Sequence, residues 1–101
     1  MAASTKLSSE AFLILTSLAD GTKHGYAIQQ DIAGLSGRRL GPGSLYGAIA
    51  RLEAAGYIAA TEAEGPRRPY RLTPSGLRAL ADAVESLRMV TSAAARRLAM
   101  P

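Results

Sequence analysis

A seam of small and apolar residues recurs in alternating steps of three and four along the last quarter of the chain. The seam consists of Leu77, Leu80, Val84, Leu87, Thr91, Ala94 and Leu98. This heptad spacing predicts one long helix with a continuous contact face. Thr73 is placed to cap the helix, and Pro74 suits its first position. Extending to Met100, the helix would be about 40 Å long at 1.5 Å per residue.

A helix of this length cannot be hidden within a domain built from a chain of 101 residues. Its seam must either contact another chain or fold back on the core, and we expect another chain. The composition agrees, because small domains often need a disulfide, a metal or a partner for stability. Cysteine is absent, which excludes disulfides and most structural zinc sites. We therefore predict that the seven seam residues form a dimerisation face. The lack of cysteine also suits a cytoplasmic location.

Two shorter helices are predicted before residue 35. The first begins at Ser8 or Ser9 and stops at Gly21, with apolar residues at helical spacing between them. The second spans residues 26–33 and stops at Gly34. The residues between these helices are expected to form a loop.

A third helix must begin near Gly41-Pro42-Gly43-Ser44, because proline is tolerated only at the start of a helix. Ser44 is expected to accept hydrogen bonds from the free amides of the first turn. The inward stripe is Leu45, Ile49 and Leu52, and the helix should end at Gly56. The opposite side is expected to present Ser44, Gly47, Ala48 and Arg51.

The spacing then changes to that of strands. Residues 57–61 and 70–73 predict two short strands, whose inner face would hold Ile58, Ala60, Tyr70 and Leu72. The turn-rich connection between them carries Arg67 and Arg68. Three short helices followed by a hairpin with a basic tip is the order of a winged helix-turn-helix. The expected fold is mainly α with a small β-hairpin. Residues 1–73 would form the winged domain and residues 74–101 the dimerisation helix.

Positive charge is concentrated in the middle of the chain. The net charge is +4, and the segment from residue 36 to 72 holds six arginines against three glutamates. Arginine suits both phosphate oxygens and the edge of guanine. This clustering favours an anionic partner.

Catalytic and membrane functions have little support in the sequence. His24 is the only histidine, and no nucleophile stands at a recognisable spacing from it. We expect it to pack or form a hydrogen bond at the head of the second helix. Phosphate-binding loops, paired carboxylates and metal-ligand spacings are not found, so neither enzymatic activity nor a cofactor or metal is expected. The apolar run at residues 11–15 is far shorter than the roughly 18 residues of a membrane span.

Several segments together resemble the PadR-like family of winged-helix regulators. The segments are His24-Gly25-Tyr26, Pro42-Gly43-Ser44-Leu45-Tyr46, Ala48 to Glu53, Gly56-Tyr57-Ile58, the Gly65-Pro66-Arg67-Arg68 wing, Tyr70 to Thr73, and Gly76. The likeness covers residues 7–80 in order. Gly47 departs from the family, because many members have proline there. The resemblance implies a homodimeric repressor that dimerises through its last helix. Some short members bind flat hydrophobic drugs with aromatic residues that include tryptophan, but this chain has no tryptophan and no aromatic residue in its last helix.

The expected partner is double-stranded DNA, bound at a pseudo-palindromic operator with half-sites about 34–36 Å apart. Tyr46 and Ser44 would meet phosphates, and Gly47 and Ala48 would meet base edges or thymine methyls. Arg51 would bind phosphate or guanine. The remaining expected contacts are Arg67 and Arg68 on the wing, with Arg38 and Arg39 before the third helix. Two alternatives stay open: a sensor that holds a small hydrophobic effector at the dimer interface, and a winged helix used for protein contact.

Overall fold

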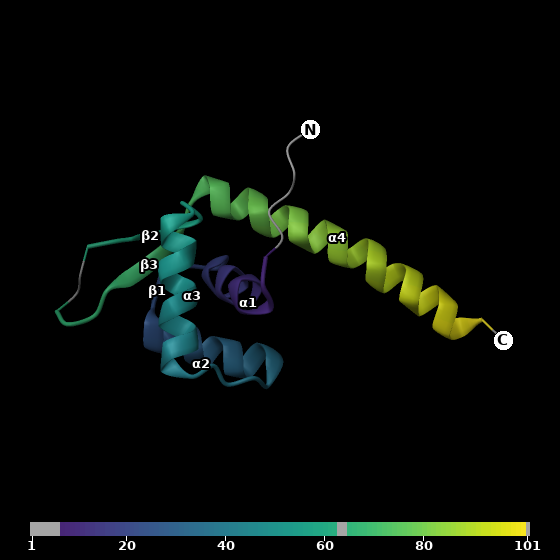
Figure 1. Cartoon of the computed structure of the whole chain (residues 1–101), viewed down its shortest axis with the longest axis horizontal. Helices are drawn as coiled ribbons and strands as arrows, with labels where there is room; N and C mark the ends of the chain where they lie inside the picture. Colours follow the sequence, from purple (N-terminus) through teal and green to yellow (C-terminus); the bar gives the residue numbers. More distant parts are fainter. Residues whose placement is uncertain (1–6, 63–64, 101) are drawn as a thin grey trace.

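Helices dominate the fold, which a computed structural model describes for residues 7–62 and 65–100. The chain order is α1 (Ser9–Leu18), β1 (Lys23–His24), α2 (Gly25–Ser36), α3 (Pro42–Ala54), β2 (Ile58–Ala60), β3 (Pro69–Leu72) and α4 (Pro74–Ala99). Figure 1 shows α1 beside α3 and below α4, with the β2–β3 hairpin at one end of the molecule and α4 extending toward the other. The described part measures 58 × 35 × 22 Å. The predicted class, mainly α with a small hairpin, is confirmed.

The starts of the helices follow from their capping residues. Ser8 accepts a hydrogen bond from the backbone amide of Ala11 and caps α1. His24 caps α2, because its Nδ1 accepts from the amide of Ala27 at 3.3 Å. The hydrogen-bonding role predicted for His24 is thus confirmed. The start of α3 differs in detail, because Gly41 takes the cap position without a side-chain bond and Ser44 does not cap.

The second helix is longer than predicted. It continues through Gly34 and ends only at Gly37, whose φ of 71° is left-handed. Glycine is tolerated within a helix at a cost of about 1 kcal/mol, whereas a left-handed end strongly favours glycine. Gly34 was therefore the wrong stop, and the glycine three residues later provides the cap.

The sheet has three strands in the order β1-β3-β2, and both pairings are antiparallel. Ile58 lies opposite Leu72 and Ala60 opposite Tyr70, so these four residues share one face as predicted. The two residues of β1, Lys23 and His24, pair with Tyr70 and Pro69. They were expected in a loop, because two residues are too few to show the alternation typical of a strand.

One hydrophobic core joins the helices to the hairpin. Thirteen residues make up its buried part: Ala11, Ile14, Leu15, Leu18, Ile28, Ile32, Leu40, Leu45, Ala48, Ile49, Leu52, Ile58 and Leu80. The central element is α1, which contacts α2, α3, α4 and β3. This helix therefore holds α3 and α4 in place relative to each other.

The start of α4 is fixed by a close junction with the turn after α3. Thr73 caps the helix by accepting from the amide of Gly76, and its hydroxyl donates to the carbonyl oxygen of Gly56 at 2.6 Å. A Cβ atom on Gly76 would overlap the carbonyl oxygen of Tyr57. The absence of a side chain at this position therefore permits the close approach of α4 to the turn.

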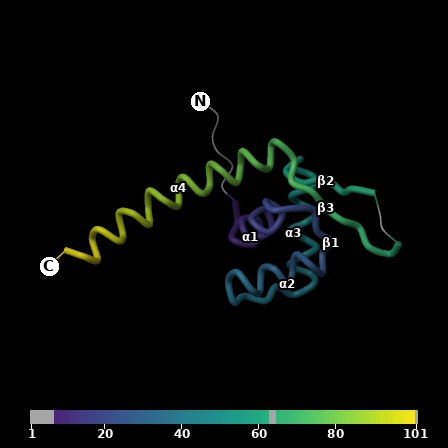
Figure 2. Tube along the Cα trace, turned by 180° about the vertical axis from the view of Figure 1, so that it is seen from behind, coloured from purple at the N-terminus to yellow at the C-terminus, as the bar shows by residue number. Residues whose placement is uncertain are grey.

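The seam of α4 is divided between two environments. Leu80 is buried in the core of its own chain, and Val84 packs against that core. Leu87 and Leu98 are 48% and 86% exposed. Figure 2 shows the second half of α4 extending away from the other helices. The prediction that Leu80 contacts a partner is corrected, because the first turns of α4 pass over α1 and bury it there.

Candidate nucleic-acid interface

The two faces of α3 differ sharply in burial. Leu45, Ala48, Ile49 and Leu52 are at most 4% exposed and face the core. The opposite face presents mainly small residues, with two larger polar ones beside them. The residues on this face are Gly43, Ser44, Tyr46, Gly47, Ala50, Arg51 and Ala54. All are exposed except Gly47, which is half-buried. The face is thus free to contact another molecule.

The placement of Ala48 corrects one predicted contact. Ala48 is 2% exposed and belongs to the core, so its methyl group is not available to a base. It lies four residues before Leu52 and three after Leu45, the spacing that places residues on one helix face. Ala50 takes its place on the outward face. The four-residue step from Tyr46 to Ala50 was the sequence signal for this assignment.

Tyr46 connects the start of α3 to the start of α2. Its ring lies against Gly25, and its hydroxyl oxygen would be 2.5 Å from a Cβ atom built on that glycine. The tyrosine is nevertheless 51% exposed. Tyr46 therefore packs against the neighbouring helix with one part of its ring and offers the rest to the outward surface.

Arg51 lies across the outward face of α3. Its Nη1 atom would be 3.5 Å from a Cβ atom built on Gly47, one turn earlier. Within residues 7–62 and 65–100, Arg51 has neither an ion pair nor a side-chain hydrogen bond. Its guanidinium group thus keeps its donors available on the same face as the small residues.

The two arginines before α3 have different surroundings. Arg38 forms an ion pair with Glu10 at 3.1 Å and donates to the hydroxyl of Ser9 at 3.2 Å. The pKa of Glu10 is lowered, first by a hydrogen bond from its own backbone amide and then by Arg38. Arg38 thus fastens the connection before α3 to α1, a role that the sequence did not indicate. Arg39 is exposed, and DNA contact by either arginine stays a prediction.

The same connection has a second anchor in the side chain of Gln29. This side chain donates to the carbonyl oxygen of Leu40 at 2.5 Å, and Leu40 itself is buried in the core. Together with Arg38, Gln29 sets the position from which α3 begins.

The wing carries two exposed arginines, Arg67 and Arg68. The amide of Thr61 donates to the carbonyl oxygen of Pro69 at 2.8 Å and continues the β2–β3 pairing one step toward the connecting loop. Pro69 is buried, so the chain leaves the tip along a fixed path. Figure 1 shows the hairpin projecting on the far side of α3 from the extended part of α4. The structure thus places two exposed cationic side chains on the connection between β2 and β3, just before β3 begins.

The sequence and the fold both match a known family. The profile of the "Transcriptional regulator PadR-like family" matches residues 14–82, a span from within α1 to the first turns of α4. The chain belongs to this PadR-like family of transcriptional regulators. The predicted resemblance is confirmed, and the family is one of regulators rather than enzymes.

Solved structures include similar folds. A transcriptional regulator of Clostridium thermocellum has a TM-score of 0.75 and 29% identity, and the match covers 85% of this chain and 89% of that one. A PadR family regulator of Clostridium difficile R20291 has a TM-score of 0.80 and 22% identity, with 90% and 99% covered. The PadR fold therefore extends through most of the present chain.

A curated relative is much longer than this chain. It is the uncharacterised 37.1 kDa protein in transposon Tn4556 of Streptomyces fradiae, which is 58% identical over 64 residues. The matched segment is 63% of this chain but only 19% of the relative. The PadR-like segment thus occurs there within a larger protein.

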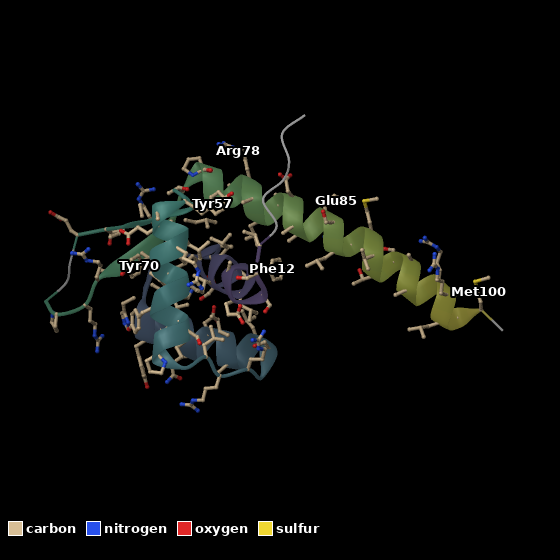
Figure 3. All side chains as sticks on the ribbon, in the orientation of Figure 1. Phe12, Tyr57, Tyr70, Arg78, Glu85 and Met100 are labelled. Atoms are coloured by element: carbon tan, nitrogen blue, oxygen red, sulfur yellow. The ribbon has the colours of Figure 1, made fainter. Side chains whose placement is uncertain are left out.

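The outer part of α4 carries a further set of exposed apolar residues on this PadR-like protein. Figure 3 shows Phe12 among the packed helices, whereas Glu85 and Met100 lie on the part of α4 that projects from them. Exposed apolar residues continue along this part: Leu87, Met89, Val90, Leu98 and Met100. Dimerisation through the outer seam, including Thr91 and Ala94, stays a prediction, as does any role for the exposed Leu77.

Two further observations limit the chemistry of the described part. No helix there is both long and apolar enough to cross a membrane. The described residues include no group of three histidine, cysteine or acidic side chains placed to hold a metal ion.

Proposed function

We propose that this PadR-like chain is a sequence-specific DNA-binding repressor that acts as a homodimer. In this proposal α3 enters the major groove, and the wing arginines Arg67 and Arg68 meet phosphates or the minor groove. The outer half of α4 pairs with the same segment of a second chain. A regulator of this kind acts where the chromosome lies, so the proposed location is the cytoplasm.

One observation carries the proposal: the division of α3 into a buried face and an outward face of small residues. The four inward residues are at most 4% exposed, so the orientation of the helix is fixed by the core. The small outward residues allow the helix backbone to lie close to a second surface. Arg51 on this face and the wing arginines supply charge that suits DNA.

The dimer determines the form of the binding site. Two copies related by a two-fold axis would place their α3 helices in successive major grooves about 34–36 Å apart. The operator should then be a pseudo-palindrome. The outer seam of α4 supports this arrangement, since Leu87 and Leu98 are exposed in the single chain.

Gel shifts on DNA from upstream of the protein's own gene test DNA binding. If each half-site has three or four arginine–phosphate contacts, the log–log salt slope should be roughly −5 to −7. Replacing both Arg67 and Arg68 with alanine should reduce the slope by about 3 to 4 per dimer. The matched control replaces Arg96 and Arg97, which lie in the last turn of α4 and should leave the slope nearly unchanged. An equal reduction of the salt slope in the wing variant and in the Arg96 and Arg97 control would contradict the proposal. An absence of DNA binding at low salt would also contradict it.

Sedimentation or light scattering tests the dimer separately. Leu98→Glu places a charge in the proposed seam and should shift the protein toward the monomer. Met89→Glu is the control, because Met89 is 68% exposed and lies on the opposite side of α4. A wild-type protein that is monomeric at micromolar concentration would refute the dimer.

A small effector is a second proposal, supported by one structural neighbour. DNA binding by BpsR of Bordetella bronchiseptica is regulated by 6-hydroxynicotinic acid, and that structure has a TM-score of 0.72 and 22% identity. A thermal-shift screen of small aromatic compounds tests this reading. A ligand at 100 times its Kd should stabilise the protein by about 2.7 kcal/mol. A hit should also change the gel shift.

A further inference from the structure

The outward face of α3 has few groups that can identify a base. Its centre is formed by Gly43, Gly47, Ala50 and Ala54, none of which has a polar side chain. Such residues can touch a thymine methyl but cannot form side-chain hydrogen bonds with base edges. Most of the hydrogen bonding that distinguishes sequences must come from the polar residues that flank this centre.

Three of the four flanking polar residues are poorly suited to that task. The ring of Tyr46 lies against Gly25, which holds it near the start of α2. Ser44 has a short hydroxyl, and a hydroxyl pairs with several bases without distinguishing them. Glu53 is exposed near the end of the helix. Its carboxylate carries a negative charge, which the DNA phosphates repel.

Arg51 differs from these residues because its side chain is long, positively charged and without an ion-pair partner among the described residues. Its guanidinium extends back over Gly47 toward the beginning of α3, where a glycine leaves space for it. Unlike Arg38, which is bound to Glu10, Arg51 has no ion-pair partner in the described ranges. A guanidinium group presents two parallel donors that match O6 and N7 of guanine.

We propose that Arg51 is the principal base-reading residue and recognises one guanine in each half-site. This inference rests on the proposed DNA-binding function and deepens it, because it assigns Arg51 to a base rather than to a phosphate. The small residues beside Arg51 then allow the helix to lie close to the bases and can contact thymine methyl groups. The operator should contain one guanine per half that tolerates no substitution.

Selection from a random duplex library tests the assignment. Wild type, Arg51→Lys and Arg51→Ala should each be used to enrich binding sequences, with Arg97→Ala as a control on a distant exposed arginine. Wild type and Arg97→Ala should enrich a guanine at the same position, and both Arg51 variants should lose that preference. Arg51→Lys keeps the positive charge, so its salt slope should match that of wild type. Thermal unfolding of the Arg51 variants should match wild type, since Arg51 is exposed.

Replacing that guanine with 7-deazaguanine provides an atomic test, because this base lacks the N7 acceptor. Wild-type affinity should fall about 10- to 100-fold, in line with the discrimination of a bidentate pair. Arg51→Ala should bind the guanine DNA and the 7-deazaguanine DNA with almost the same affinity. An equal fall in affinity for wild type and Arg51→Ala on the modified DNA would overturn the assignment while the DNA-binding function stands. An unchanged sequence preference in Arg51→Ala would do the same. If wild type enriches no sequence, the proposed function itself is refuted.

Discussion

The two longest helices, α3 and α4, carry apolar stripes of similar spacing but meet different surroundings. In α3 the whole stripe is buried, from Leu45 to Leu52. In α4 only Leu80 is buried and Val84 packs beside it, while Leu98 near the end is 86% exposed. Periodicity therefore predicts which face of a helix is apolar. It does not predict how much of that face the chain itself covers.

The difference follows from the position of α1. This helix contacts both α3 and α4, but its ten residues cover only part of a helix of 26 residues. At 1.5 Å per residue, α1 spans about 15 Å and α4 about 39 Å. The covered turns of α4 belong to the core, and the remaining turns are left for another contact.

The largest expected effect is at the junction that directs α4 over α1. Gly76→Ala would bring a methyl group into the carbonyl oxygen of Tyr57, which is backbone and cannot rotate away. We expect the free energy of unfolding to fall by about 4 kcal/mol or more, because the start of the helix must shift. Chemical denaturation measures this loss.

Gly34→Ala is the matched control for that substitution. A Cβ atom on Gly34 would meet no atom within 4 Å, so alanine should stabilise α2 by about 0.5–1 kcal/mol. If Gly76→Ala were equally harmless, α4 would not be held by this junction. The contrast between its covered and exposed halves would then need another cause.

A pair of leucine truncations tests the contrast directly. Leu45→Ala in α3 removes a residue that is 1% exposed and should cost about 3 kcal/mol. Leu98→Ala in α4 should change the unfolding free energy of the isolated chain by less than about 0.5 kcal/mol. Thermal melts at several protein concentrations distinguish the two sites. Any loss from Leu98→Ala should depend on concentration, because it would arise from the second chain.

Much of α3 could be predicted from the sequence because local rules determine it. Proline at residue 42 and the spacing of Leu45, Ile49 and Leu52 indicated its start and its core face. Ala48 was assigned to the wrong face, since alanine is small enough to suit either side and adds little to the apolar pattern. Arg38 could not be assigned, because its partner Glu10 lies 28 residues away and meets it only in the folded chain.

A smaller effect concerns the buried hydroxyl within α1, the helix that supports both α3 and α4. Ser17 is fully buried, and its Oγ has no hydrogen-bond partner in the described structure. Ser17→Ala should therefore stabilise the chain by about 1 kcal/mol, since an unsatisfied buried group is removed and helix propensity improves. Chemical denaturation measures the gain. A loss of stability instead would show that the hydroxyl has a partner, such as a bound water.

The smallest effect concerns the ion pair that fastens the connection before α3. The pKa of Glu10 is held below its ordinary value of 4.5 by its own backbone amide and by Arg38. A lowered pKa means that the folded state favours the charged carboxylate. The contribution of the Glu10 carboxylate to the free energy of unfolding is therefore complete above the ordinary pKa. It is lost as the pH falls through the lower pKa of the folded state. Glu10→Gln should lower Tm slightly at pH 6 to 7, and the difference from wild type should disappear as the pH falls through the lowered pKa of the folded state.

Glu85→Gln is the control, because Glu85 lies on the projecting part of α4 (Figure 3) and has no ion pair among the described residues. It should show no comparable change in the difference from wild type over the same pH range. Melting curves of the three proteins from pH 7 to 3 provide the measurement. A Tm difference for Glu10→Gln that stays constant with pH would show that Glu10 acts by packing rather than charge. In that case the position of α3 would be set by the Gln29 hydrogen bond and by core packing, and the ion pair between Arg38 and Glu10 would not contribute.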